Sequence, residues 1–123
     1  MALGNARSAS TVVGMGEYVQ VQSSISSREK GLEIARSLIE SHLAACAQVV
    51  GPMTSTYRWK GEVQVDEEYL LLIKTPAARY SDVEAHIHRM HDYSVAEIIS
   101  VPINSGLVSY LAWMDEETQA PDA

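Results

Sequence analysis

The sequence of 123 residues predicts an α+β protein of the ferredoxin-like plan, in which a sheet carries its helices on one face. Three observations favour this fold. Runs of alternating polar and apolar residues, typical of strands, are separated by runs with apolar residues three and four apart, typical of helices. Their order along the chain is strand, helix, strand with hairpin, strand, helix, strand and helix. The length suits one compact domain.

The first strand and helix lie near the N-terminus. Residues 18–22 alternate in polarity, with valines on one face, and predict a half-buried strand. Ser26, followed three residues later by Glu29, has the spacing of a capping box, and apolar residues at helical spacing follow it. We therefore expect the first helix over residues 27–42. The small apolar segment 45–50, which ends at a Gly-Pro pair, predicts a second strand closely covered by a helix.

A long hairpin is predicted over residues 54–65. Two alternating runs flank Lys60-Gly61, and glycine supplies the positive φ that a tight turn requires. Residues 69–73 are apolar on both faces, which is typical of a central strand. The predicted hairpin is rich in Tyr, Thr and Val, and exposed strand edges of this composition are sites of association. We therefore expect a closed homo-oligomer.

The second half of the chain completes the pattern. Apolar residues at steps of three and four predict a second helix over 76–90. The segment 91–96 is expected to be a loop, and residues 97–101 form a predicted strand that ends at a proline. A short third helix is expected over 107–114, followed by a polar C-terminal tail over 118–123.

Charge and cysteine content exclude several classes of protein. Sixteen acidic residues against nine Lys and Arg give a net charge of −7, so nucleic acid and anionic membranes are not expected partners. No apolar run approaches the ~20 residues of a membrane-spanning helix. The single cysteine, Cys46, excludes an intrachain disulfide, and residues 1–16 lack the apolar stretch of a signal peptide. We expect a cytoplasmic protein with a flexible N-terminal extension over residues 1–16.

The motifs of common enzymes are missing from the sequence, which has no glycine-rich phosphate loop and no nucleophile elbow. Cys46 follows the C-terminal end of the first predicted helix, where the helix dipole disfavours a thiolate. A catalytic role is therefore disfavoured, and Cys46 is interpreted as either a small core residue or a soft metal ligand. The acidic triplets 66–68 and 115–117 are interpreted as solvated surface. We expect no enzymatic activity.

Histidines give one candidate metal ligand of interest. His86 and His88 lie two positions apart on a predicted helix, so their side chains diverge by about 200° and cannot hold one ion. His91 instead opens a loop that leads to Glu97. A set of Cys46, His91 and Glu97 would combine thiolate, imidazole and carboxylate, which suits copper or zinc better than calcium or magnesium.

Five blocks of sequence, in this order, resemble the CutA divalent-cation tolerance family over residues 18–117. They are Leu43-Ala44-Ala45-Cys46, Thr54-Ser55-Thr56-Tyr57-Arg58-Trp59-Lys60-Gly61-Glu62, Leu71-Leu72-Ile73-Lys74-Thr75, His91-Asp92-Tyr93 with Glu97-Ile98-Ile99, and Tyr110-Leu111-Ala112-Trp113. The resemblance implies a ferredoxin-like domain over residues 17–117, similar to the PII signal-transduction proteins. It also implies a homotrimer assembled by strand pairing between subunits.

The same resemblance implies a role in tolerance of divalent metal ions. It assigns a divalent cation such as copper to Cys46, His91 and Glu97, as in some members of the family. The chain departs from the family pattern at three positions, which are Gln48 in place of Asn, and Asp92 and Ala96 in place of Pro. Loss of two prolines loosens the backbone of the loop that carries two of the three ligands.

Alternatives to the metal-binding trimer remain open. A PII-like signalling or scaffold trimer would bind a small ligand or a partner protein in clefts between subunits, with the loop 91–97 lining one of them. An enzyme that uses Cys46 with His91 would alkylate rapidly at neutral pH. Four further residues of the resembling blocks are expected to have structural or interface roles. These are Tyr57, Trp59, Lys74 and Trp113.

Overall fold

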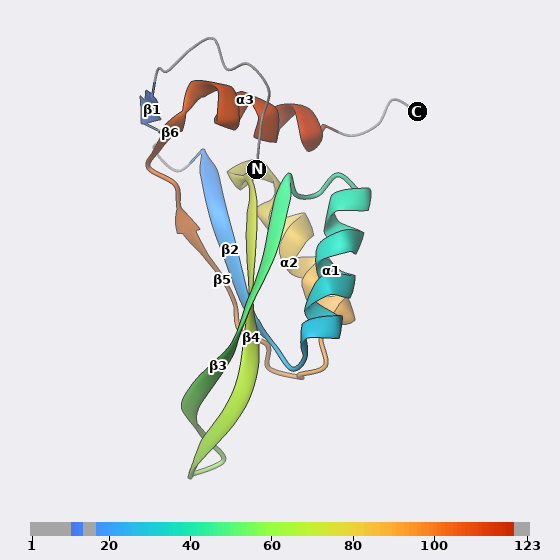
Figure 1. Cartoon of the computed structure of the whole chain (residues 1–123), viewed down its shortest axis with the longest axis vertical. Helices are drawn as coiled ribbons and strands as arrows, with labels where there is room; N and C mark the ends of the chain where they lie inside the picture. Colours follow the sequence, from blue (N-terminus) through green and yellow to red (C-terminus); the bar gives the residue numbers. More distant parts are fainter. Residues whose placement is uncertain (1–10, 14–16, 120–123) are drawn as a thin grey trace.

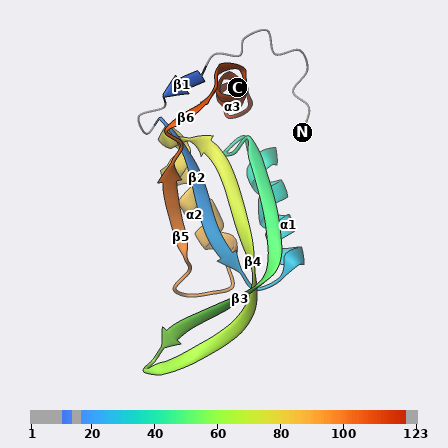
Figure 2. The same ribbon diagram turned by 60° about the vertical axis from the view of Figure 1, so that its left-hand side comes forward.

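The computed structural model describes residues 11–13 and 17–119 of the chain. Its main sheet is antiparallel, with the strand order β3-β4-β2-β5. The strands are β2 (Tyr18–Ile25), β3 (Cys46–Trp59), β4 (Glu62–Pro76) and β5 (Ile98–Pro102). Helices α1 (Arg28–Glu40) and α2 (Tyr80–Met90) cover one face of the sheet (Figures 1 and 2). This arrangement confirms the predicted ferredoxin-like fold.

The main core lies between the sheet and these two helices. Alternation along β2 turns Val19, Val21 and Ile25 toward α1 and α2, as the sequence predicts. Buried apolar residues of β4, α1 and α2 complete this core, and burial of each such side chain contributes about 1.5–3 kcal/mol. They include Leu71, Ile73, Ile34, Leu38, Val83 and Ile87.

Helix α1 begins close to the predicted position. The side chain of Ser27 caps it by accepting a hydrogen bond from the backbone nitrogen of Lys30, at 3.1 Å. The cap lies one residue later than the capping-box spacing indicates. Helix α2 is preceded by the 3-10 helix η1 (Ala77–Arg79), so the predicted second helix is correct in extent but begins with a tighter turn.

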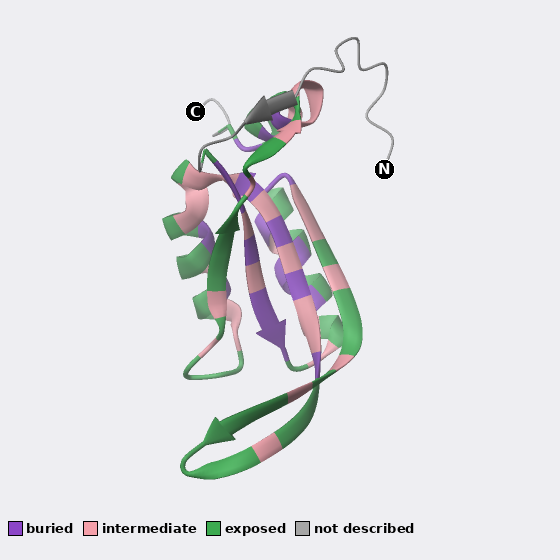
Figure 3. Cartoon of the chain, turned by 90° about the vertical axis from the view of Figure 1, so that its left-hand side faces the viewer, coloured by how far each residue is buried: buried purple, intermediate pink, exposed green. Residues whose placement is uncertain are grey.

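The β3–β4 hairpin is longer than predicted. The strand expected over 45–50 and the hairpin expected over 54–65 form one continuous pair of strands. We call residues 53–68 the arm. The arm extends beyond the body of the protein and is mostly exposed (Figures 1 and 3). Its turn has positive φ at Lys60 (50°) and Gly61 (82°), in agreement with the predicted tight turn.

Gly51-Pro52 makes a bulge at the base of the arm. Val50 pairs with Leu70, whereas Met53 pairs with Glu68, so the register shifts between these pairs. Gly51 has a φ of 150°, and a Cβ atom there would lie 2.7 Å from Cδ2 of Tyr69. A Gly-Pro pair can therefore bend a strand without ending it, which is why the predicted strand boundary was wrong.

A second, smaller sheet pairs a segment near the N-terminus with one near the C-terminus. It pairs β1 (Thr11–Val13) with β6 (Ser105–Leu107), and the sequence predicted neither strand. Three residues of the predicted flexible extension therefore form a strand, while residues 1–10 and 14–16 lie outside the described residues. Helix α3 (Val108–Glu117) follows β6 and packs over a second small core. Its buried members are Tyr18, Ala45, Leu111 and Met114.

The predicted C-terminal tail begins as an ordered end of α3. Thr118 is buried, and its hydroxyl donates to the backbone oxygen of Met114 at 2.8 Å. Nη2 of Arg79 donates to the backbone oxygen of Thr118 at 2.6 Å, which ties this end to η1. Residues 120–123 of the predicted tail lie outside the described residues. No helix in the described ranges combines the length and the apolar character needed to cross a membrane.

The sheet face opposite α1 and α2 is partly open. Lys74 on β4 and Gln48 on β3 share this face, and Nζ of Lys74 donates to Oε1 of Gln48 at 2.7 Å. Strand β5, at one edge of the sheet, exposes Ile99 and Val101 on the same face. Apolar side chains on an open face beside a free strand edge are typical of an interface.

Candidate functional site

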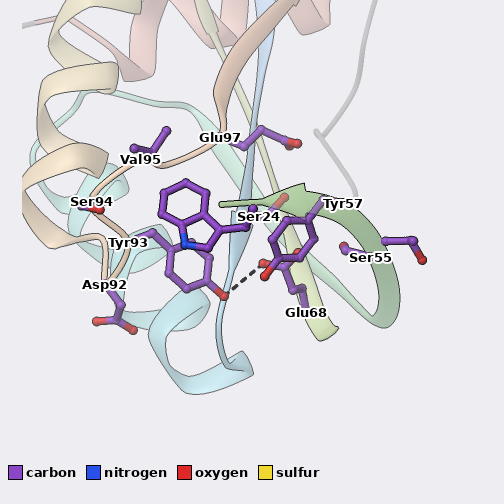
Figure 4. Close-up of a pocket in the computed structure, with 11 residues that line it drawn as sticks. Ser24, Ser55, Tyr57, Glu68, Asp92, Tyr93, Ser94, Val95 and Glu97 are labelled. Carbon is purple, nitrogen blue, oxygen red and sulfur yellow. Dashed lines mark hydrogen bonds between the residues drawn. The ribbon is translucent and has the colours of Figure 1, made fainter. Parts of the chain in front are cut away.

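A cleft of about 690 Å³ lies between the arm and the loop 91–97, which connects α2 to β5 (Figure 4). Residues from β2, β3, β4 and the loop contribute to its lining. Aromatic rings and carboxylates are the two chemical groups that characterise it. They belong to Tyr57, Trp59, Tyr93, Glu68, Asp92 and Glu97.

Glu68 joins the arm to the loop. Its carboxylate accepts a hydrogen bond from the phenol of Tyr93, at 3.0 Å to Oε2, and Figure 4 shows the two side chains meeting in the cleft. Glu68 is only 6% exposed. Burial, followed by the bond to Glu68, raises the pKa of Tyr93 to about 12. Tyr93 therefore remains a neutral hydrogen-bond donor at physiological pH.

A second phenol–carboxylate pair lies farther out on the arm. Tyr57 donates a short hydrogen bond to Oδ2 of Asp66, which lies two residues from Gln64, the cross-strand partner of Tyr57. This bond is the main cause that raises the pKa of Tyr57. Asp66 and Glu68 lie two residues apart on β4, so their side chains share one face of the strand. Both phenols thus present their rings near carboxylates.

His91 fixes the loop against the sheet. Its Nε2 donates to the backbone oxygen of Ser24 on β2 at 2.8 Å, and its Nδ1 accepts from the backbone nitrogen of Tyr93 at 3.1 Å. The ring also contacts Tyr93, with centroids 4.9 Å apart. Both ring nitrogens are thus occupied by backbone groups. A metal ion could bind either nitrogen only after one of these hydrogen bonds is broken.

Asp92 and Glu97 stand at the rim of the cleft. Ser26, before α1, donates to Oδ2 of Asp92 at 2.7 Å and so ties the loop to the β2–α1 connection. Glu97 is exposed and immediately precedes β5. Two of the three predicted metal ligands, His91 and Glu97, therefore lie on one short loop.

Cys46 lies at the other end of the sheet. It pairs with Lys74, which in turn pairs with Gln20 on β2, whereas His91 binds Ser24, four residues farther along that strand. Four strand residues span about 13 Å. The thiol lies beside the hydroxyl of Tyr110 on α3, and burial, followed by interaction with Cys46, raises the pKa of Tyr110. Cys46 is therefore separated from His91 and Glu97 within one protomer.

One protomer consequently holds no complete metal site of the predicted kind. Within residues 11–13 and 17–119, no group of three or more His, Cys, Asp and Glu residues is arranged to hold a metal ion. The donor atoms of Cys46, His91 and Glu97 therefore do not meet within this chain.

The importance of Glu68 was missed at the level of sequence. The triplet 66–68 was interpreted as solvated surface, and this is wrong for Glu68, which is buried. Its position could have indicated this, because Glu68 is spaced two residues from Leu70 and four from Leu72 on a continuous strand. The expected structural role of Tyr57 and Trp59 is compatible with their place on the wall of the cleft.

Comparison with protein families finds one matching model. The model described as "CutA1 divalent ion tolerance protein" matches residues 19–117. Among curated proteins, "Divalent-cation tolerance protein CutA" of Thermus thermophilus is 42% identical over 94 residues, which are 76% of this chain and 91% of the relative. "Protein CutA, chloroplastic" of Arabidopsis thaliana is 38% identical over 112 residues, which are 91% of this chain but only 59% of that relative.

Solved structures give the same result for the fold. The structure of CutA from Xylella fastidiosa matches with a TM-score of 0.82 and 31% identity, covering 84% of this chain and 99% of that one. The divalent cation tolerance protein from Thermus thermophilus matches with a TM-score of 0.80 and 39% identity, covering 83% and 99%. A CutA from Archaeoglobus fulgidus, titled periplasmic, matches with a TM-score of 0.81 and 29% identity, covering 83% and 99%.

Proposed function

The chain belongs to the CutA1 divalent ion tolerance family, and from this premise we propose that it acts in the tolerance of divalent metal ions as a homotrimer that binds copper or a similar divalent cation. The exposed apolar surface of the arm is the observation that carries the proposal. We further propose that the protein is cytoplasmic and is not an enzyme. Separation of Cys46 from His91 supports the latter point, because a thiol nucleophile needs a base or cation beside it.

The arm exposes large apolar side chains to water. Val63 and Val65, which share one face of the arm, are 62% and 61% exposed. Tyr57 and Trp59 lie on the opposite face, which lines the cleft. These side chains lie on a two-stranded ribbon that has left the body of the protein, and an isolated hairpin is at best marginally stable in water. Two highly exposed valines side by side on one face of such a ribbon mark an interface.

The free edges of the sheet support a closed ring. Strands β3 and β5 are the two edges, so one protomer offers an edge at each side. In the proposed assembly the arm of one protomer pairs with an edge of the next, and three such contacts close the ring. Ile99 and Val101 on β5 would be covered in the same step.

The proposed metal ligands are Cys46, His91 and Glu97, contributed by more than one protomer. Thiolate, imidazole and carboxylate together favour copper over hard cations. His91 would have to release the backbone nitrogen of Tyr93 or the backbone oxygen of Ser24 to bind the ion. Assembly and metal binding are therefore separate parts of the proposal and need separate tests.

Light scattering at micromolar concentration tests the assembly. A mass of three chains supports the homotrimer, and a monomer rejects it. Calorimetry with copper then tests the ligands by comparing the wild type with Cys46→Ser and Glu97→Gln, with Glu67→Gln as the control of equal charge change. Heat that is lost in the first two variants and kept in the control supports the set. Equal heat in all four proteins rejects it.

A second candidate function is favoured by the cleft itself. A volume of about 690 Å³ is within the range of ligand pockets, roughly 300–1,000 Å³. The trimer would then act as a PII-like sensor or scaffold that takes up a small molecule between the arm and the loop 91–97. A ligand response that persists in Cys46→Ser would distinguish this function from metal binding at the proposed ligand set.

A further inference from the structure

Glu68 is a buried carboxylate without a cationic partner. It is 6% exposed, and its hydrogen bond in the described part of the chain comes from the neutral phenol of Tyr93. The ion pairs found among the described residues join Lys30 to Glu33 and Arg36 to Glu40, so none involves Glu68. Burial of a charge without an opposite charge is unfavourable. The site is therefore electrostatically incomplete.

Aromatic rings line the same cleft as this carboxylate. Tyr57 and Trp59 lie on β3 and Tyr93 on the loop, and all three line the cleft together with Glu68. Figure 4 shows the rings of Tyr57 and Tyr93 on either side of the Glu68 carboxylate. The faces of aromatic rings attract cations through their quadrupole. The Trp59 ring already has the ammonium of Lys60 at 5.9 Å from its centroid, on the exposed turn of the arm.

The charged residues that line the cleft favour a positively charged ligand. Glu68, Asp92 and Glu97 all contribute to it, and none of its eleven residues is a Lys, Arg or His. A nucleotide or a carboxylate metabolite would meet only negative charge there. A bare metal ion is also a poor fit, because no three ligating side chains in the described residues are arranged around one point.

We propose that the cleft binds a small organic ammonium compound, whose charged head contacts the Glu68 carboxylate and the rings of Tyr57, Trp59 and Tyr93. The volume of about 690 Å³ accommodates such a molecule. This inference rests on the second candidate function and names the class of its ligand. Glu68 provides the charge, and the aromatic residues distinguish an alkylated ammonium group from a hydrated inorganic cation.

An NMR titration with choline tests the inference in the full-length protein. The chain has two tryptophans, so the indole N–H signal of Trp59 reports on the cleft and that of Trp113, on α3, serves as an internal reference. We expect choline to shift the Trp59 signal in a saturable manner. Dimethylbutanol, the uncharged isostere of choline, is expected to cause no comparable shift. Equal shifts from the two compounds would overturn the inference.

Two adjacent glutamates provide matched variants. Glu68→Gln removes the buried charge but leaves an oxygen that can accept from Tyr93, and we expect the Kd for choline to rise about tenfold or more. Glu67→Gln makes the same change in net charge at an exposed residue outside the lining, and we expect less than about a twofold effect. An equal effect of the two variants would overturn the inference, because net charge alone would then explain binding.

Light scattering on the same samples separates this inference from the proposed assembly. A trimer whose Trp59 signal does not respond to choline overturns the inference and leaves the homotrimer intact. Should Glu68→Gln also break up that trimer, a cationic side chain of a second copy would be the partner of Glu68 instead of a small molecule. A trimer that binds choline through Glu68 supports both.

Discussion

Replacement of His91 by alanine removes two hydrogen bonds that position the loop 91–97, one to the sheet and one within the loop. One bond joins Nε2 to the backbone oxygen of Ser24, and the other joins Nδ1 to the backbone nitrogen of Tyr93. A neutral hydrogen bond contributes about 0.5–1.5 kcal/mol, so we expect His91→Ala to lower the free energy of unfolding by about 1–3 kcal/mol. The loss is expected in metal-free protein.

The assay is urea unfolding in the presence of a chelator, at one fixed protein concentration for all variants because assembly affects apparent stability. His88→Ala is the matched control, since His88 lies one helical turn earlier and is exposed. We expect it to change stability by less than about 0.5 kcal/mol. Hydrogen exchange of the Tyr93 backbone amide provides a local measurement and is expected to accelerate in His91→Ala.

The result that refutes this reasoning is a His91→Ala protein as stable as His88→Ala without metal. His91 would then contribute nothing to the position of the loop, and a ligand role without a structural one would remain. If His91→Ala instead destabilises the chelated protein as expected, the histidine is a positioning residue whether or not copper binds. The experiment thus separates two roles that a loss of metal binding alone would not distinguish.

Four other predictions concern single residues. Ser23→Ala is expected to stabilise the protein by about 1 kcal/mol in urea unfolding, because the fully buried Ser23 hydroxyl has no hydrogen-bond partner in the described part of the chain; a destabilised variant would contradict this. Val65→Glu is expected to shift the proposed trimer toward monomer in light scattering, because it puts a charge on the apolar surface of the arm. Burial and the charge of Arg89 lower the pKa of His86 from 6.5. As the pH falls below this value, the unfolded state therefore binds more protons than the folded state, and stability decreases. We expect His86→Gln to make this decrease smaller, as measured by urea unfolding between about pH 7 and 5. Tyr93 is expected to ionise at about pH 12, so the folded state keeps a proton that the unfolded state loses above about pH 10. Stability is therefore expected to fall as the pH rises through this range. In ultraviolet titration, Tyr93→Phe is expected to form one phenolate fewer at about pH 12 than the wild type.

Sequence patterns predicted the body of the fold because its elements follow simple periods. Alternation along residues 18–22 and helical spacing behind Ser27 both place apolar side chains in one core. Strand β6 escaped prediction because three residues are too few to show a period. Strand β1 escaped it because its partner lies more than ninety residues away along the chain. Pairing of distant short segments is a tertiary property.

The candidate site was only partly predictable, for a related reason. The loop from His91 to Glu97 was recognisable by its density of polar side chains. Its contact with the arm depends on how far the arm bends, and local sequence does not specify this. Cys46 was grouped with His91 by chemistry, although the strand register keeps the two apart within a protomer. Residue types alone carry no distances.

The bulge at Gly51-Pro52 determines which side chains of β3 face the cleft. From Val50 to Met53 the strand advances three residues while its partner advances only two, from Leu70 to Glu68. Even-numbered residues of β3 share a face with Leu70 before this point, and odd-numbered residues share the continuation of that face after it. Tyr57 and Trp59 are odd-numbered. If all residues between Val50 and Met53 were kept and paired without a bulge, Thr56 and Arg58 would take the places of Tyr57 and Trp59 on this face, and a hydroxyl and a positive charge would replace two rings.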